Sequence, residues 1–176
     1  EVYDDARVYD DARVSGDAWV FGNAQVYDNA RVYGNARVSG DAWVYGDAQV
    51  KQNMYIKFGK LTTDRLQDII RCSLNVVPVG GFYYLWKRVN KVSDGVYASC
   101  YDSNFTYRDG EIAEVEDYDK DESVSCGSGL HVSTPDYWNE GDTLIACKVK
   151  LEDIICCQSG KLRVKRLEVV GEVRYN

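Results

Sequence analysis

The sequence predicts a mostly β protein, in which a strand-forming repeat over residues 1–51 precedes a compact α+β domain. Three observations predict this class. Small apolar residues recur every six positions through the first fifty residues, which suits a stack of short strands. The six-residue pattern and the composition both change after Lys51. Beyond that point, one helical pattern is followed by many strand patterns separated by glycine-containing turns.

Eight hexapeptides follow one another from Val2 without an insertion, reading VYDDAR, VYDDAR, VSGDAW, VFGNAQ, VYDNAR, VYGNAR, VSGDAW and VYGDAQ. A period of six excludes an amphipathic helix, whose apolar positions recur about every 3.6 residues. Alanine and the valine two residues later share one face of a short strand, so we expect both to point inward. Gly, Asp and Asn at the corners suit turns.

This regularity resembles the left-handed parallel β-helix of hexapeptide-repeat proteins. The resemblance implies that three hexapeptides make one triangular coil, so eight copies give about 2.7 coils. The acyltransferases and carbonic anhydrases of that family depend on histidines, and the repeat contains none. We therefore interpret residues 1–51 as a scaffold.

Large aromatic side chains are expected on the outside of these coils. Surface ladders between neighbouring strands are one interpretation of them. The other is an interface, since Trp and Tyr are enriched where proteins associate. Most hexapeptide-repeat proteins are parallel homotrimers, which favours the second interpretation. The expected interface residues of a homotrimer are Tyr9, Trp19, Phe21, Tyr27, Trp43 and Tyr45.

Residues 52–81 are expected to form a helical connector or cap. The helix is predicted from Asp64, a suitable N-cap, to Leu74, with Leu66 and Ile70 on its apolar face. Residues 82–176 are predicted to form the α+β domain that binds a ligand or partner. Its expected strands are 82–89, 95–99, 105–107, 111–115, 130–133, 143–151, 154–157 and 161–173.

Composition and charge exclude several classes of function. The net charge of −7 argues against general nucleic-acid binding, which needs a basic face. No apolar run approaches the roughly 18 residues of a membrane span, so no membrane association is expected. No leader is visible before the repeat. The six cysteines are expected to be reduced and buried, which indicates a cytoplasmic protein.

Neither a metal site nor a cofactor site is predicted. The cysteines form no C-x-x-C pair, and adjacent Cys156 and Cys157 are poorly spaced for zinc. In the acidic stretch 109–122, Asp117, Asp119 and Asp121 alternate as in a calcium loop. The required glycine and terminal glutamate are missing there. We interpret this stretch as a solvated loop.

Any small ligand is expected near a glycine turn and the one histidine of the chain. Backbone amides of such a turn can hold an anion, and a basic strand nearby would supply positive charge. Two tyrosines could stack on a base, although either could equally be core. The predicted ligand-binding residues are Gly127, Ser128, Gly129, His131, Lys161, Arg163, Arg166, Tyr97 and Tyr107. No catalytic residues are assigned, since acid–base candidates are few.

Residues 82–173 resemble an uncharacterised domain of tailed-phage and prophage proteins, where it follows β-helical repeats. The resemblance rests on the runs YLWKRVNKVSDGVYAS, TYRDGE, CGSGLHVS, TLIACKVKLEDI and GKLRVKRLEVVGEV. It implies a viral protein acting inside a bacterium. A weaker similarity is to ADP-ribosyltransferase-like folds, although no His-Tyr-Glu set can be placed here.

Two functions follow from these observations. The first is a non-catalytic, phage-type oligomer whose C-terminal domains bind a host protein or a small nucleotide-like ligand, with a role against host defence. The alternative is an ADP-ribosyltransferase-like enzyme acting on a nucleotide-like substrate in the C-terminal domain.

Overall fold

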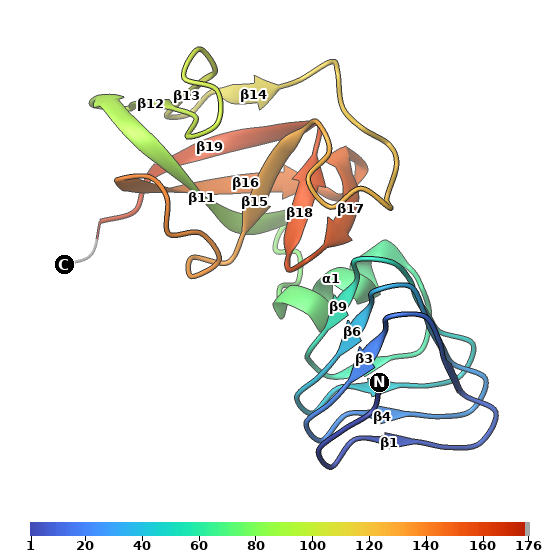
Figure 1. Ribbon diagram of the computed structural model, residues 1–176. Helices are drawn as coiled ribbons and strands as arrows, with labels where there is room; N and C mark the ends of the chain where they lie inside the picture. The colour runs from blue at the N-terminus through green and yellow to red at the C-terminus, as the bar shows by residue number, and fades with distance from the viewer. Residues whose placement is uncertain (175–176) are drawn as a thin grey trace. The chain divides into compact units, whose positions relative to one another are not determined.

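The structure is a computed structural model that describes residues 1–174. The chain divides into two compact units (Figure 1). The first contains Glu1–Val77 together with residues 121–126 and 157–160. The second contains residues 78–120, 127–156 and the chain from Lys161 onward.

The first unit is a three-sided β-solenoid of two-residue strands. Its three parallel sheets have the orders β1-β4-β7-β10, β2-β5-β8 and β3-β6-β9. Arg7 pairs with Gln25 and Gln25 with Trp43, so one coil takes three hexapeptides, as the resemblance to hexapeptide-repeat proteins implied. The strands are β1 Arg7–Val8, β2 Arg13–Val14, β3 Trp19–Val20, β4 Gln25–Val26, β5 Arg31–Val32, β6 Arg37–Val38, β7 Trp43–Val44, β8 Gln49–Val50, β9 Tyr55–Ile56 and β10 Lys60–Leu61.

The inward assignment of alanine and valine is confirmed, since these side chains are fully buried from Ala18 to Val50. The corners carry Gly, Asp or Asn because the chain turns there with positive φ. At Gly16, for example, φ is +66° and a Cβ would lie 3.1 Å from the carbonyl oxygen of Gly34 in the next coil. Close stacking of coils therefore explains the small corner residues.

Strand pairing continues beyond Lys51, where the sequence pattern ends. β9 pairs with β6, and β10 with β7, although neither β9 nor β10 belongs to a complete hexapeptide. Helix α1, Leu66–Leu74, follows and packs on both strands, burying Ile69 and Ile70. The predicted N-cap was wrong: Arg65 is the N-cap residue, and no side chain caps the helix.

The second unit is mainly an antiparallel sheet, not the α+β domain that the sequence predicted. The order is β14-β19-β16-β11-β15-β18-β17, and the hairpin β12–β13 joins at β11. Within the described part of this unit, the short 3₁₀ helix η1, Leu151–Asp153, is the only helix. The strands are β11 Phe82–Ser93, β12 Val96–Ala98, β13 Thr106–Arg108, β14 Ile112–Glu114, β15 Leu130–Ser133, β16 Thr143–Lys150, β17 Ile154–Gln158, β18 Lys161–Val164 and β19 Arg166–Glu172.

The single strand predicted over residues 161–173 is in fact two. The strand is interrupted at Lys165. The backbone NH of this residue donates to the Asp153 carbonyl (3.0 Å), and its ammonium pairs with the Asp153 carboxylate (3.6 Å). β18 then pairs with β15, whereas β19 lies between β14 and β16. This break separates basic residues that are neighbours in sequence.

Candidate functional site

Strands β15 and β18 bring three of the predicted site residues together. His131 pairs with Arg163 across the two strands, and Ser133 pairs with Lys161. The adjacent strand β11 adds Lys87, which was not predicted from the sequence. Its ammonium donates a hydrogen bond to the His131 carbonyl oxygen at 3.0 Å. Four basic side chains therefore gather on neighbouring strands: Lys87, His131, Lys161 and Arg163.

Lys161 and Arg163 of this group are buried and engaged with the protein itself. Arg163 is 1% exposed, and its guanidinium donates to the Asp119 carbonyl (2.8 Å) near the Asp119 carboxylate (4.0 Å). Lys161 is 3% exposed and donates to the Tyr137 hydroxyl at 3.3 Å, with its ammonium over the Tyr137 and Trp138 rings. Neither cation faces open solvent.

The glycine turn is likewise occupied by the chain. A Cβ on Gly127 would lie 2.3 Å from the carboxylate of Asp119, and the Asp119 amide donates to the Ser128 carbonyl at 2.9 Å. At Gly129, a Cβ would come within 2.9 Å of the Arg163 side chain. The space beside these two glycines is therefore filled by Asp119 and Arg163. It is not available to an anionic ligand.

The predicted stacking tyrosines and Arg166 lie elsewhere. Tyr97 and Tyr107 face each other across β12 and β13 and are 0% and 2% exposed, so neither offers a ring face to a ligand. Burial raises the pKa of Tyr97 to about 12, with a further contribution from Asp109. Arg166 begins β19, which is separated from β18 in the sheet by β16, β11 and β15.

His131 is held in its neutral form at physiological pH. Burial, together with the nearby Lys87, Lys161 and Arg163 cations, lowers the pKa of its imidazole to about 4. Because the chain has one histidine, its titration can be followed without overlap.

We expect the free energy of unfolding to fall as the pH is lowered from 7 to 5. The unfolded chain takes up a proton near pH 6.5, and the folded chain takes up that proton only near pH 4. The stabilisation is therefore complete above about pH 6.5, and at most about 2 kcal/mol is lost by pH 5. Urea unfolding at both pH values, with His131→Gln as the non-titrating comparison, measures it. A histidine NMR signal that titrates near 6.5 in the folded protein would contradict this expectation.

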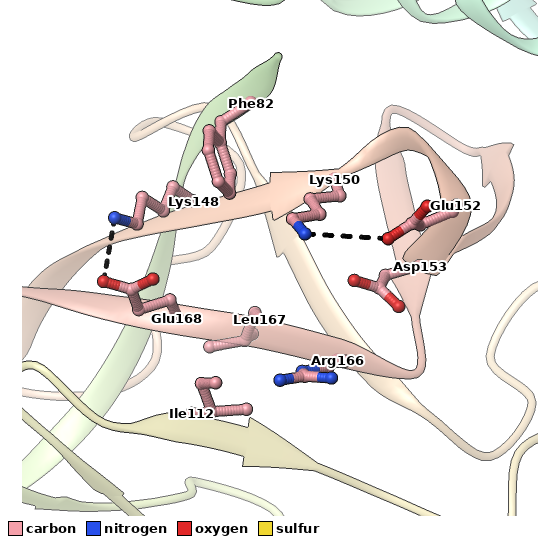
Figure 2. A pocket seen from close by; sticks show the side chains of 9 residues that line it. All are labelled: Phe82, Ile112, Lys148, Lys150, Glu152, Asp153, Arg166, Leu167 and Glu168. Atoms are coloured by element: carbon pink, nitrogen blue, oxygen red, sulfur yellow. Dashed lines mark ion pairs between the residues drawn. The ribbon is translucent and has the colours of Figure 1, made fainter. Parts of the chain in front are cut away.

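An open pocket is lined by residues of four consecutive strands, β11, β16, β19 and β14, and of η1 (Figure 2). Its volume is about 260 Å³. Lys148 and Lys150 alternate on the pocket side of β16, because side chains in a strand point to opposite sides in turn. The lining residues are Phe82, Ile112, Lys148, Lys150, Glu152, Asp153, Arg166, Leu167 and Glu168.

The carboxylates of this pocket are already paired with lysines. Glu168 pairs with Lys148 (2.8 Å) and Glu152 with Lys150 (3.7 Å), as Figure 2 shows. Asp153 pairs with Lys165. Arg166 lines the same pocket and has no ion pair within residues 1–174. After internal pairing, the pocket therefore keeps one positive charge available to a ligand.

Phe82 supplies an aromatic surface in the same pocket, next to the two lysines of β16. Its ring lies 5.1 Å from the ammonium of Lys148 and 5.9 Å from that of Lys150. None of these three residues was predicted from the sequence. The available signal was the alternation of Lys148 and Lys150 within the strand KVK, which indicates one polar face. Nothing in the sequence placed Phe82 opposite Lys150, a long-range pairing that only the structure gives.

The aromatic residues predicted at the interface stack within the chain. Tyr9, Tyr27 and Tyr45 form a ladder with ring centroids 5.0 and 4.8 Å apart. Trp43 meets Tyr27 edge-on. On another side of the solenoid, Phe21 stacks on Tyr3, and Trp19 packs edge-on against Tyr3. These contacts join neighbouring coils, and Tyr9 and Trp19 still expose 41% and 38% of their surface.

Comparison with known proteins identifies the repeat region. Residues 2–16, 6–22, 24–37 and 30–46 match the family described as the YdcK beta solenoid repeat. The matched residues are about a quarter of the chain. No curated protein and no solved structure matches the chain significantly. Over residues 1–174, none of the helices is long and apolar enough to cross a membrane.

Proposed function

We propose that this protein is a non-catalytic binding protein, in which the β-solenoid is a scaffold and the antiparallel sheet domain binds a small nucleotide-like anion in the pocket of Figure 2. The observation that carries the proposal is Arg166, a lining cation without an ion pair in the described part of the chain. Arg166 was also among the ligand-binding residues predicted from the sequence.

The chemistry of the pocket favours a ligand with one anionic group and one planar ring. A guanidinium without an internal partner can form charge-assisted, bidentate hydrogen bonds to a phosphate or carboxylate. Phe82 and Ile112 provide apolar surface for the ring. A volume of about 260 Å³ is near the lower end of small-molecule sites. A mononucleotide, with its phosphate at Arg166 and its base toward Phe82, satisfies these features.

We expect Arg166→Gln to weaken binding of AMP by about 10- to 100-fold, as loss of one charge-assisted contact implies. Isothermal titration calorimetry against AMP, ADP-ribose and NAD measures the dissociation constants. Arg108→Gln is the matched control, because Arg108 is also exposed, ends β13 and lies outside the pocket. Arg108→Gln should bind AMP with the same affinity as the wild type.

Two results would contradict this proposal. One is the absence of saturable binding to every probe, and the other is equal affinity of the wild type and Arg166→Gln. Mass spectrometry of the recovered ligand separates binding from turnover. Ligand recovered intact supports a binding protein, whereas cleaved NAD would support the ADP-ribosyltransferase-like enzyme instead.

The scaffold in this proposal is a parallel homotrimer built through a left-handed solenoid. Support comes from Tyr9 and Trp19, which remain exposed after the stacking within the chain. The resemblance to phage and prophage proteins supports a cytoplasmic role in a bacterial cell, directed against host defence, with a host protein as the other candidate partner.

We expect light scattering to give three times the chain mass, and Trp19→Ser with Trp43→Ser to shift the mass toward one chain. Both residues lie on the outside of the coils, so the double change leaves the buried valines and alanines in place. A wild-type mass of one chain at every concentration would rule out the trimer. Circular dichroism of the double variant checks that the solenoid is intact.

A further inference from the structure

A second, smaller cavity lies on the sheet domain beside His131. Its volume is about 30 Å³, and it is lined by Lys87, Arg88, Cys100, Tyr101, His131, Trp138 and Glu140. A water molecule needs about 10–15 Å³ of such space, so this cavity suits a group of two oxygen-sized atoms. None of these residues lines the pocket of Figure 2.

Lys87 makes the cavity unusual, because it is a buried cation without a carboxylate partner. It is 8% exposed, on the core-facing side of β11 with Leu85 and Val89. Its ammonium donates to the His131 carbonyl and lies 5.3 Å from the Tyr107 ring. No ion pair within residues 1–174 involves it. Burial lowers the pKa of this ammonium, because its charged form is costly away from water unless an opposite charge compensates it.

The surrounding groups of the chain do not supply that opposite charge. Burial raises the pKa of the Cys147 thiol to about 12 and also raises that of Cys100, so both are neutral thiols at physiological pH. The Cys100 thiol points to the carbonyl oxygens of Arg88 and Glu140, at 3.6 and 3.7 Å. Glu140 is the one lining carboxylate, and its residue is exposed.

Two further nitrogen atoms of lining residues are buried without a hydrogen-bond partner. They are Nε2 of His131 and Nε of Arg88. In the tautomer protonated at Nε2, neutral His131 can donate a hydrogen bond there, and Nε of Arg88 always carries a proton. Buried donors of this kind are normally satisfied in folded proteins, by protein, water or ligand.

We propose that this cavity binds the carboxylate group of a small monoanion, which accepts hydrogen bonds from Lys87 and His131 beneath the rim formed by Tyr101 and Trp138. A carboxylate matches the size of the cavity, compensates the buried ammonium and satisfies the unpartnered Nε2 of His131. The nearby Lys161 and Arg163 cations strengthen the positive potential at His131. This site is independent of the pocket at Arg166.

The test follows the single histidine by NMR while acetate is added, with acetamide as a neutral probe of the same shape. Sodium Hepes, whose sulfonate ion is too large for the cavity, keeps the ionic strength constant. We expect acetate to shift the His131 imidazole signal saturably and acetamide to leave it almost unchanged. Equal responses to both probes, or a response to acetate that does not saturate, would overturn the proposal.

Variants locate the effect. Lys87→Gln should raise the dissociation constant of acetate by about tenfold or more. Lys120→Gln, at an exposed lysine of the same unit, should not change it. Arg166→Gln should also leave it unchanged, which separates this site from that of Figure 2. An unchanged constant in Lys87→Gln would overturn the proposal. If that variant does not fold, the wild-type comparison of acetate with acetamide decides alone.

Discussion

Val26→Asp is expected to unfold the solenoid, at a cost of about 4 kcal/mol or more. Val26 is fully buried in β4, the strand between β1 and β7, where its side chain contacts the interior of the coil stack. An aspartate there would lose apolar packing and place a carboxylate among valines and alanines, where no cation lies. Hydrogen exchange over residues 1–60 would report the loss of protected amides directly.

Gln25→Asp is the matched control, because Gln25 is the neighbouring residue of the same strand and points outward. It accepts a hydrogen bond from the Tyr9 hydroxyl at 3.2 Å, so its replacement should cost only about 1 kcal/mol. Both variants introduce an aspartate into β4, so a difference in their stability reflects whether the replaced side chain points inward or outward. Similar exchange rates for the two variants would contradict the inward assignment of valine.

Gly141→Ala is expected to destabilise the sheet domain by about 3 kcal/mol or more. Gly141 has φ of +101°, which side chains rarely adopt. An added Cβ would also lie 2.8 Å from the Val89 carbonyl oxygen and 2.9 Å from both the Val89 nitrogen and the Cys100 sulfur. Two of these three atoms belong to the backbone of β11, so a side-chain movement cannot relieve the clash. Urea unfolding measures the change.

Gly80→Ala separates backbone strain from the clash. Gly80 also has positive φ, at +59°, and nothing lies within 4 Å of the position of a Cβ. This change should cost about 1 kcal/mol, the strain of a left-handed residue alone. Equal losses of stability in the two alanine variants would mean that close packing against β11 is not the reason that position 141 requires glycine.

The solenoid could be predicted almost completely from the sequence. Valine and alanine recur at fixed positions, so the same local interaction is repeated in every coil. The structure of one repeat therefore predicts that of the others. The prediction failed where the repetition ends. β9 and β10 continue the parallel sheets without the full hexapeptide pattern, because packing of α1 stabilises the last coil.

The candidate sites were predicted only in part. His131 and Arg163 were expected to be neighbours, and β15 and β18 do pair there. Arg166 was expected beside them, but the chain break at Lys165 sends it to another part of the sheet. The buried position of Lys87 had a signal that was missed: Leu85, Lys87 and Val89 alternate on one face of a strand.

The sequence alone therefore determined the period and the inward residues of the repeat, since these depend on contacts at one constant separation along the chain. The three-sided coil was implied by the resemblance to hexapeptide-repeat proteins. Tertiary structure decided the order of the antiparallel strands, the burial of Lys161 and Arg163, and the placement of Arg166 in a different pocket. These features depend on pairing between distant segments, whose registers are selected by packing of the whole sheet. No local pattern carries that information.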